Sequence, residues 1–370
     1  GTVMNGKLIE SPKSFQVACT IVTQIIAAVA SSQYGGQSVD VRHLGKYLRR
    51  SREKITRQIS GIAGGHLDDE TMNRLIDARL REELKSGVQT IQYQINTLMT
   101  TNGQSPFVTL FLNLDKDDEY LEENAMIVEE ILRQRLEGIK NEKGVYVTPA
   151  FPKLIYVLDE HNCLKGGKYD YITKLAVECS SKRLYPDYIS AKQMRATYQG
   201  NVFSCMGCRS FLSPWKDENG NFKFEGRFNQ GVVSINLPQI GILANKDEDA
   251  FWKLFDERLE LCFEALMVRH NALKGIKSDV SPIHWQYGAI ARLNKGETID
   301  KLLYGGYSTI SLGYIGLYEV TKLMKGVSHT QPEGEEFALR VMRHMREATD
   351  RWKKETGLGF ALYGTPAESL

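Results

Sequence analysis

Two cysteines spaced as Cys-x-x-Cys, Cys205 and Cys208, are the residues of this sequence best suited to chemistry. A dithiol oxidoreductase would use both thiols, with one thiol pKa lowered at a helix start. A zinc half-site would need a second ligand pair, which His161 and Cys163 could supply, although their spacing does not favour it. In the third interpretation, which we favour, Cys205 packs as an apolar strand residue and Cys208 acts alone.

Cys208 differs from its partner because its neighbours are typical of a loop tip. Gly207 permits backbone angles that are closed to residues with a side chain, and Arg209 is unsuited to a core. The polar stretch that follows, and then a return into a strand ending at Pro238, predict a loop over about residues 200–237. We predict that this loop carries Cys208 into the active site of a large α/β enzyme.

Polar residues around the return strand and near the end of the chain are further candidates. Asn229 and Asn236 could hydrogen-bond a polar ligand from a pocket wall, or simply satisfy a turn and a strand end. Residues 363–369 combine a strand end, a glycine, a threonine and a proline. Such a helix start offers free N–H groups to a phosphate, although an ordinary helix cap has the same pattern.

Strands that alternate with long helices position these residues and predict an α/β fold with strands covered on both faces. Buried strands are expected at residues 107–112 and 153–158, and further strands at 232–237 and 360–363, with strand-like runs at 281–287 and 307–312. Helices are expected at 12–32 (capped by Ser11), 39–62, 68–101, 117–140, 169–182, 247–274 and 334–354. Residues 185–188 are expected to form a loop.

Composition excludes several classes of function. A net charge of +2 gives no reason to expect nucleic acid or a membrane surface as partner. No apolar run reaches membrane-spanning length, and the six scattered cysteines do not suggest a disulfide framework, so we expect a cytoplasmic protein. The basic helix at 39–62 is either a solvated face or a landing site for a polyphosphate. Nucleotide-binding glycine loops and HExxH are absent, as is any usable histidine motif.

Several stretches resemble one known family, the catalytic subunit of the anaerobic, oxygen-sensitive (class III) ribonucleoside-triphosphate reductase. Residues 206–212, 226–229 and 233–238 closely resemble its finger loop. Other stretches of that subunit are resembled by residues 31–38, 311–316 and 363–368. The matches run from one end of the chain to the other, and they are specific together although none suffices singly.

The resemblance implies a ten-stranded α/β barrel of two half-barrels, with the finger loop threading its centre. It implies that Cys208 is the thiyl radical site, which abstracts the ribose 3′ hydrogen atom before the 2′ hydroxyl is lost, and that Asn229 holds the ribose hydroxyls. Such a hydrogen-atom donor needs close placement in a water-excluded cavity rather than a lowered pKa. The implied substrate-binding residues are Asn236, Gly364, Thr365 and Ser369.

The resemblance also implies a homodimer that binds a dNTP or ATP effector at its interface, where the effector selects the ribonucleoside triphosphate to be reduced. We therefore expect effector and dimer helices in residues 1–102 and the catalytic barrel core in residues 103–370. The implied effector-binding residues are Glu10, Lys13, Gln24, Lys54 and Arg57.

Two features of that family are missing from this sequence. Its glycyl radical, generated by a radical-SAM iron-sulfur activase, lies in a C-terminal domain beside a zinc site of four cysteines, and a second active-site cysteine would precede residue 1. Both ends of the chain look cut, and we expect no metal site and no turnover from this chain alone. The alternatives are another glycyl radical enzyme, which gives no reason for a nucleotide effector site, and a nucleotide-binding module without catalysis.

Overall fold

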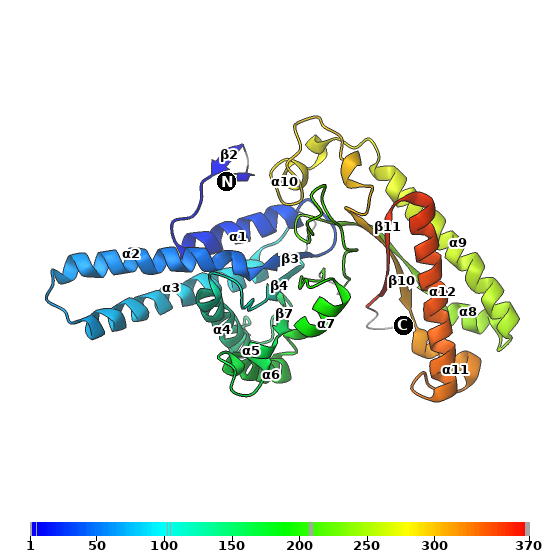
Figure 1. Ribbon diagram of the computed structural model, residues 1–370, viewed down its shortest axis with the longest axis horizontal. Helices are drawn as coiled ribbons and strands as arrows, with labels where there is room; N and C mark the ends of the chain where they lie inside the picture. Colours follow the sequence, from blue (N-terminus) through cyan, green and yellow to red (C-terminus); the bar gives the residue numbers. More distant parts are fainter. Residues whose placement is uncertain (1, 5, 102, 104, 207–209, 367–370) are drawn as a thin grey trace. The chain divides into compact units, whose positions relative to one another are not determined.

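The chain divides into two compact units, residues 1–207 and 208–370, in a computed structural model that describes residues 2–4, 6–101, 103, 105–206 and 210–366 (Figure 1). The first unit contains the hairpin β1 (Thr2–Met4) and β2 (Lys7–Ile9), α1 (Phe15–Ala30), β3 (Gln37–Asp40), the 3-10 turn η1 (Val41–Leu44), α2 (Gly45–Ala63), α3 (Asp69–Thr97), β4 (Val108–Leu112), α4 (Leu121–Glu137), the hairpin β5 (Ile139–Lys140) and β6 (Tyr146–Val147), β7 (Lys153–Leu158), α5 (Glu160–Cys163), α6 (Asp170–Arg183), β8 (Asp187–Ser190) and α7 (Ala191–Thr197). The second contains β9 (Asn229–Asn236), α8 (Leu237–Ala244), α9 (Glu248–Leu273), η2 (Ser278–Val280), α10 (Pro282–Trp285), η3 (Asp300–Leu302), β10 (Thr309–Ile315), α11 (Leu317–Lys325), α12 (Pro332–Thr356) and β11 (Gly359–Gly364).

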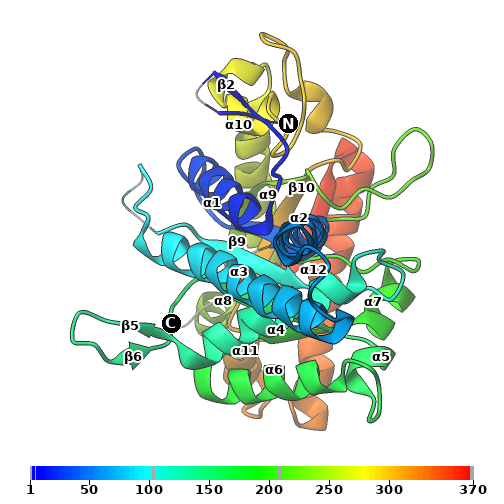
Figure 2. The same ribbon diagram turned by 90° about the vertical axis from the view of Figure 1, so that its left-hand side faces the viewer.

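A parallel sheet in the order β3-β4-β7-β8 forms the centre of the first unit. All five residues of β4 are buried, as expected of a parallel strand covered on both faces. One apolar core joins this sheet to the helices of the unit, with α1 against α3 and α4 against α6 (Figure 2). Gly87 lets α3 approach α1 closely, because a Cβ there would lie 2.5 Å from the ring of Phe15.

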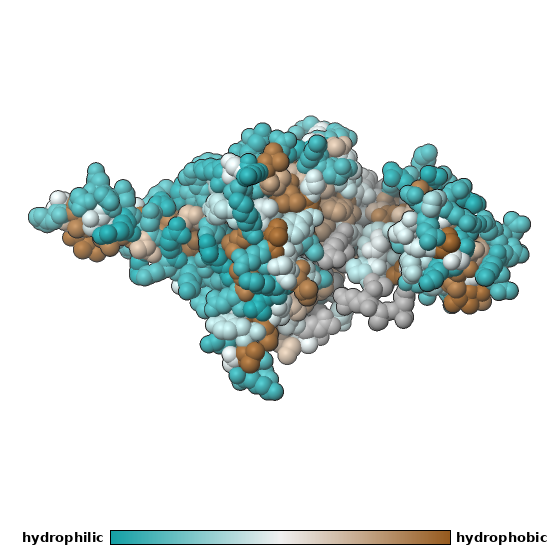
Figure 3. Space-filling model, turned by 90° about the horizontal axis from the view of Figure 1, so that it is seen from below, coloured by the Kyte–Doolittle hydropathy of each residue, from teal (hydrophilic) through white to brown (hydrophobic). Residues whose placement is uncertain are grey.

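The antiparallel helices α2 and α3 extend from this unit as a long arm, drawn in blue in Figure 1. Gly64 ends α2 in the left-handed conformation, and the Asp68 side chain caps α3 by accepting from Thr71 N at 2.8 Å. The face in Figure 3 is mainly hydrophilic with scattered apolar spots, one of them at the tip of the arm. Ile62, near the end of α2, is 87% exposed.

The second unit contains a parallel sheet in the order β11-β10-β9. Its core includes the fully buried side chains of Phe251 and Phe255 from α9, together with Trp352 from α12 and Phe360 from β11. The carboxyl ends of the three strands meet at one edge, so residues far apart in sequence become neighbours there.

The α/β class is confirmed, because the described residues form parallel sheets of four and three strands between helices. The predicted strand at 153–158 is confirmed at its bounds, and the long helices predicted at 68–101, 247–274 and 334–354 are present as α3, α9 and α12. In the part of the chain that the structure describes, no helix is both long and apolar enough to cross a membrane.

Four local predictions were wrong. Ser14, not Ser11, caps α1, because its side chain accepts from Val17 N. Residues 39 and 40 belong to β3, which pairs in parallel with β4, and helix α2 begins only at Gly45. The expected loop at 185–188 gives way to β8, which pairs with β7. The run at 281–287 is not a strand, because Pro282 starts the short helix α10.

Candidate functional site

The carboxyl edge of the three-stranded sheet brings together residues predicted to bind substrate. In register, Gly313 of β10 lies opposite Ser234 of β9 and Tyr363 of β11. Just beyond β11, the Thr365 hydroxyl lies 2.6 Å from the Ser234 hydroxyl, and Thr365 N donates to Tyr314 O at 3.0 Å. Ligands of α/β proteins bind at such edges. Gly364 and Thr365 therefore lie where a ligand would be expected.

Asn229 begins β9 at an irregularity in the pairing with β10, where one extra residue of β9 is accommodated. Its Nδ2 donates to Ser311 Oγ at 2.5 Å and its Oδ1 accepts from Gly231 N at 2.8 Å, so both ends of the amide are oriented. Asn236 ends the same strand, and its Oδ1 caps α8 by accepting from Gln239 N at 3.1 Å. Both asparagines thus make turn and strand-end hydrogen bonds, which the sequence offered as the alternative to ligand binding.

Cys208 and Ser369 lie outside the described residues. Cys205 is buried with 3% exposure, as expected, but no strand forms around it; its carbonyl accepts from Ser38 Oγ at 2.7 Å. On the other side of the gap, Ser210 and Leu212 are buried. Buried residues therefore lie both before and after Cys208 in the sequence.

A basic pocket in the first unit contains three of the five predicted effector residues. The pocket has a volume of about 620 Å³ and is lined by Lys13, Arg50, Glu53, Lys54, Arg57 and Gln58. Four cations against one carboxylate give the pocket a net positive charge that suits an anion, and its volume is in the range of ligand pockets. Glu10 and Gln24 are exposed residues that do not line it.

Hydrogen bonds between helices fix the start of α1 beside this pocket. Phe15 N donates to the buried Ser51 Oγ of α2 at 2.8 Å, and Ser51 Oγ donates to Glu83 of α3 at 2.7 Å. Gln16 N donates to the same Glu83 oxygen at 3.2 Å, which places a carboxylate at the helix start. Arg50 donates to Pro12 O at 3.0 Å and so ties α2 to the residues next to Lys13.

Arg50, Glu53 and Gln58 also line this pocket and were not predicted as members of it, although the sequence carries a signal for them. Residues 50, 53, 54 and 57 follow the spacing of one helix face, so α2 turns them toward the same side. Other cations of this helix are engaged elsewhere: Arg49 pairs with Glu123 at 2.8 Å and Arg52 with Asp77 at 2.8 Å.

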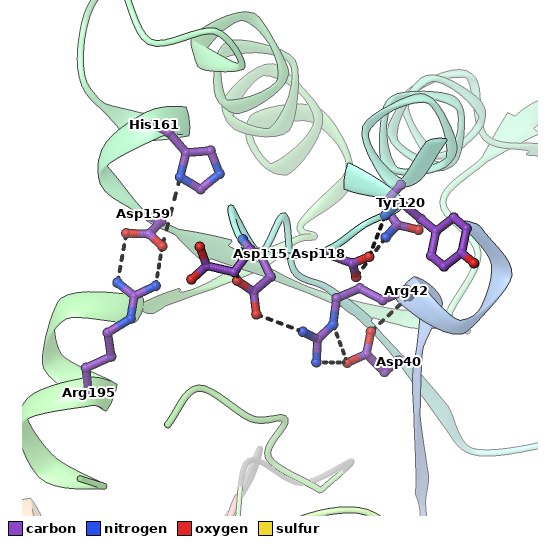
Figure 4. Close-up of polar contacts among 10 residues, drawn as sticks. Asp40, Arg42, Asp115, Asp118, Tyr120, Asp159, His161 and Arg195 are labelled. Atoms are coloured by element: carbon purple, nitrogen blue, oxygen red, sulfur yellow. Dashed lines mark hydrogen bonds and ion pairs between the residues drawn. The ribbon is translucent and has the colours of Figure 1, made fainter. Parts of the chain in front are cut away.

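The carboxyl edge of the four-stranded sheet holds a charged cluster that was also missed (Figure 4). Asp40 ends β3, and Asp115 follows β4. Arg42 joins them, with Nη2 2.7 Å from Asp40 and Nη1 3.1 Å from Asp115. The carboxyl ends of parallel strands lie at the same edge of a sheet. Acidic residues after successive predicted strands could therefore have predicted this cluster.

Asp159, directly after β7, forms the other half of the cluster. Arg195 of α7 donates to both of its carboxylate oxygens, at 3.0 and 2.5 Å, and His161 Nδ1 lies 4.0 Å away. The hydrogen bonds from Arg195 lower the pKa of Asp159 below its ordinary value. The Asp159–Arg195 pair thus connects α7, which follows β8, to the end of β7. No group of three or more potential metal ligands occurs in this cluster or elsewhere among the described residues.

We expect Asp159→Asn to destabilise the protein at neutral pH by about 1 kcal/mol, since the pair is partly open to solvent through Arg195. Asparagine still caps α5, so the change removes chiefly the charge. Because folding lowers the pKa of Asp159, the stabilisation exists above the unfolded pKa and is lost as the pH falls through the folded pKa. Urea unfolding at several pH values measures the difference in free energy of unfolding between the wild type and the variant. A difference that persists in strong acid would contradict the prediction. Asp77→Asn, in a more exposed pair with Arg52, is the control.

This chain is similar in sequence to known proteins over its whole length. The family model for anaerobic ribonucleoside-triphosphate reductase matches residues 1–370. The reductase of that name from Escherichia coli K12 is 39% identical over 381 residues, covering all of this chain and 51% of the relative. The enzyme of Enterobacteria phage T4 is also 39% identical, with 59% of the relative covered. This chain thus spans about half the length of these curated relatives.

Solved structures show the same fold. The anaerobic ribonucleotide reductase from Thermotoga maritima with citrate in the active site gives a TM-score of 0.65 at 14% identity, over 99% of this chain and 62% of that one. The same enzyme with dATP bound in the specificity site gives 0.63 at 14% identity, over 97% of this chain and 57% of that one. The sequence match over the whole chain, supported by this fold, shows that the chain belongs to the anaerobic ribonucleoside-triphosphate reductase family.

Proposed function

We propose that the protein containing this chain reduces ribonucleoside triphosphates to deoxyribonucleoside triphosphates by radical chemistry, under the control of a bound deoxynucleotide. The observation that carries the proposal is the match of all 370 residues to the reductase family. The basic pocket on α2 supports the control by a nucleotide, because three residues implied for effector binding line it.

We place both parallel sheets in a ten-stranded α/β barrel of two half-barrels, with the loop of residues 200–237 at its centre. Support comes from the all-parallel pairing within each sheet and from the likeness to the Thermotoga maritima enzyme. Residues 1–102 then contribute effector and dimer helices, and residues 103–370 the catalytic core. Within the first unit these two parts share one sheet, because β3 pairs with β4.

The side chains of this chain divide the chemistry among them. The Cys208 sulfur, as a thiyl radical, takes the hydrogen atom from the ribose 3′ carbon, and the 2′ hydroxyl then takes up a proton and leaves as water. An external reductant supplies the electrons and protons, and the Cys208 sulfur returns the hydrogen atom to the 3′ carbon. Asn229, held by Ser311 and Gly231, offers its amide to the ribose hydroxyls. Asn236 and Gly364, the last residue of β11, receive the remainder of the nucleotide together with Thr365 and Ser369, which follow that strand.

The family's glycyl radical and its zinc site require different residues: the radical requires a single thiol, and the zinc site requires several cysteines close together. A glycyl radical would supply the one-electron oxidation of the Cys208 thiol to a thiyl radical, by accepting its hydrogen atom. The described cysteines do not fit a zinc site: Cys19, Cys179, Cys205 and Cys262 are buried at separate places, and none belongs to a group of potential metal ligands in the described residues.

Further partners follow from the same proposal. A radical-SAM iron-sulfur activase would generate the radical, and ATP would join the dNTPs as an effector. We also propose a cytoplasmic homodimer. Val17, 48% exposed, and the half-buried Ile21 and Ile25 give α1 an apolar stripe at helical spacing that a second copy could cover.

Replacing both Lys54 and Arg57 by glutamine should weaken dATP binding, because two cations that face the triphosphate are removed from the pocket. We expect about a hundredfold loss in affinity, which corresponds to about 2.7 kcal/mol. Isothermal calorimetry measures the affinity directly.

The matched control removes the same kind of charge from the same helix outside the pocket. Arg52→Gln breaks an exposed pair with Asp77 and should leave dATP affinity within about twofold of the wild type. Because the control removes one charge and the double variant two, a loss of about tenfold in the control would mean that only the overall charge matters, and the pocket would lose its assignment.

Turnover by the full-length protein tests the proposed function as a whole. With activase and reductant present, we expect CTP to be converted to dCTP, with a rate that depends on the effector. The chain of residues 1–370 alone should convert none. Failure of the activated full-length protein to reduce any of the four ribonucleoside triphosphates would remove the proposed activity.

A further inference from the structure

Arg227 is a buried arginine at the base of the loop that precedes β9. It is 8% exposed, and its guanidinium donates to four main-chain carbonyls from three segments of the second unit. Nε donates to Tyr307 O at 2.6 Å, and Nη1 to Lys223 O at 3.2 Å. Nη2 donates to Ser213 O at 2.6 Å and to Gly306 O at 2.8 Å. One side chain therefore links both arms of the loop to the residues before β10.

Ser213 is the point at which the chain coming from Cys208 is fixed. Its carbonyl accepts from Arg227, its N donates to the Thr309 hydroxyl at 2.9 Å, and its own hydroxyl lies 3.4 Å from Phe360 O. Its backbone is therefore held from both sides, by Arg227 and by the start of β10. Ser210 and Leu212 are also buried, so the packed part of the loop extends from Ser213 back to Ser210.

A guanidinium is better suited than any other side chain to link carbonyls on three segments of the chain. Its planar group has five N–H donors in a fixed fork, whereas a lysine ammonium is a point charge that cannot reach carbonyls on three segments. Burial lowers the pKa of Arg227 to about 10, so the group remains charged at neutral pH. A charge buried among carbonyls alone is costly, so the four hydrogen bonds of Arg227 must offset that cost.

We propose that Arg227 is a positioning residue for the radical step: by fixing Ser213, it sets where the loop presents the Cys208 sulfur to the ribose. This inference rests on the proposed function, in which Cys208 is the hydrogen-abstracting residue. A hydrogen-atom transfer depends steeply on the approach of the two atoms, and a misplacement of about 1 Å can cost about a hundredfold in rate. Arg227 would act through the loop and would not touch the substrate.

The chain offers a matched control in Arg135 of the first unit. This guanidinium is 2% exposed, donates to Pro149 O at 2.6 Å and to Pro152 O, and has a pKa lowered by burial to about 10. Arg135→Lys therefore imposes the same kind of loss on a buried arginine that does not touch the loop.

We expect Arg227→Lys and Arg135→Lys to lower the melting temperature of the full-length protein similarly, whereas only Arg227→Lys lowers kcat, by about a hundredfold. KM, dATP affinity and the yield of glycyl radical, measured by electron paramagnetic resonance, should stay near the wild-type values in both. If kcat falls equally in the two variants, the loss reflects stability and the positioning role is wrong. An inactive wild type would instead overturn the proposed function.

A second readout needs no activity. Lys216 and Lys223 lie exposed in the loop, so trypsin cleavage at these sites should become about tenfold faster in Arg227→Lys and remain unchanged in Arg135→Lys. Thr309→Val removes the other support of Ser213 and serves if Arg227→Lys does not fold. It should show the same faster cleavage and lower kcat; wild-type behaviour in both assays would overturn the proposal.

Discussion

Replacing Cys208 by serine in the full-length protein is expected to abolish nucleotide reduction and leave effector binding intact. A serine hydroxyl has a much stronger bond to hydrogen than a thiol, so the radical cannot be passed to it. Cys208 itself lies outside the described residues, while the predicted effector pocket lies in the first unit and should be undisturbed. Conversion of CTP and calorimetric titration with dATP measure the two properties in one preparation.

Cys205→Ser is the matched control, because it makes the same substitution three positions earlier at a buried residue. We expect it to cost about 1 kcal/mol of stability and to retain reduction. Retained reduction in Cys208→Ser would remove that sulfur from its role, and loss in both variants would reopen the interpretation of the two cysteines as a redox pair.

Gly313→Ala is expected to damage the carboxyl edge of the three-stranded sheet. A Cβ at this position would overlap the Thr365 hydroxyl and lie 2.5 Å from the Ser234 hydroxyl. The hydrogen bond between those two groups must then break, at a cost of about 1–3 kcal/mol of stability for the overpacked site. Because the proposed substrate site lies there, KM for CTP should rise about tenfold.

Gly61→Ala provides the contrast for the same chemical change. Gly61 lies inside α2, and a Cβ there would meet nothing within 4 Å. We expect a gain of about 0.5–1 kcal/mol in stability, because alanine favours the helix, with KM unchanged. An unaltered KM in Gly313→Ala, despite lower stability, would argue against substrate binding at this edge.

The sequence was most informative where one strong pattern covers a long segment. The helices α3 and α9 and the buried strand β7 were predicted because their patterns are unbroken over the whole element. β3 and β8 were missed because each has four residues and owes its existence to pairing with a neighbour. A short strand at a sheet edge has little local signal, since its backbone partners lie far away in sequence.

The same limit applies to the candidate sites. Lys13, Lys54 and Arg57 were implied by a family resemblance, and the structure places them around one pocket, whereas Glu10 and Gln24 lie outside its lining. The links from Asp159 to Arg195 and from Arg227 to Ser213 depend on loop geometry that no spacing rule encodes. The roles of all these residues in binding or catalysis stay predictions.

The parallel pairing in both sheets has a consequence for how this chain folds. Each pair needs a crossover, and between β3 and β4 the whole α2–α3 hairpin must be made first. β9 and β10 are likewise separated by α8, α9 and α10. Folding that depends on such distant pairings is slow, because chain entropy is lost before the contacts form. During synthesis, β3 and β9 would each wait unpaired until their partners emerge, and these strands are the points where a stalled chain is most exposed to aggregation.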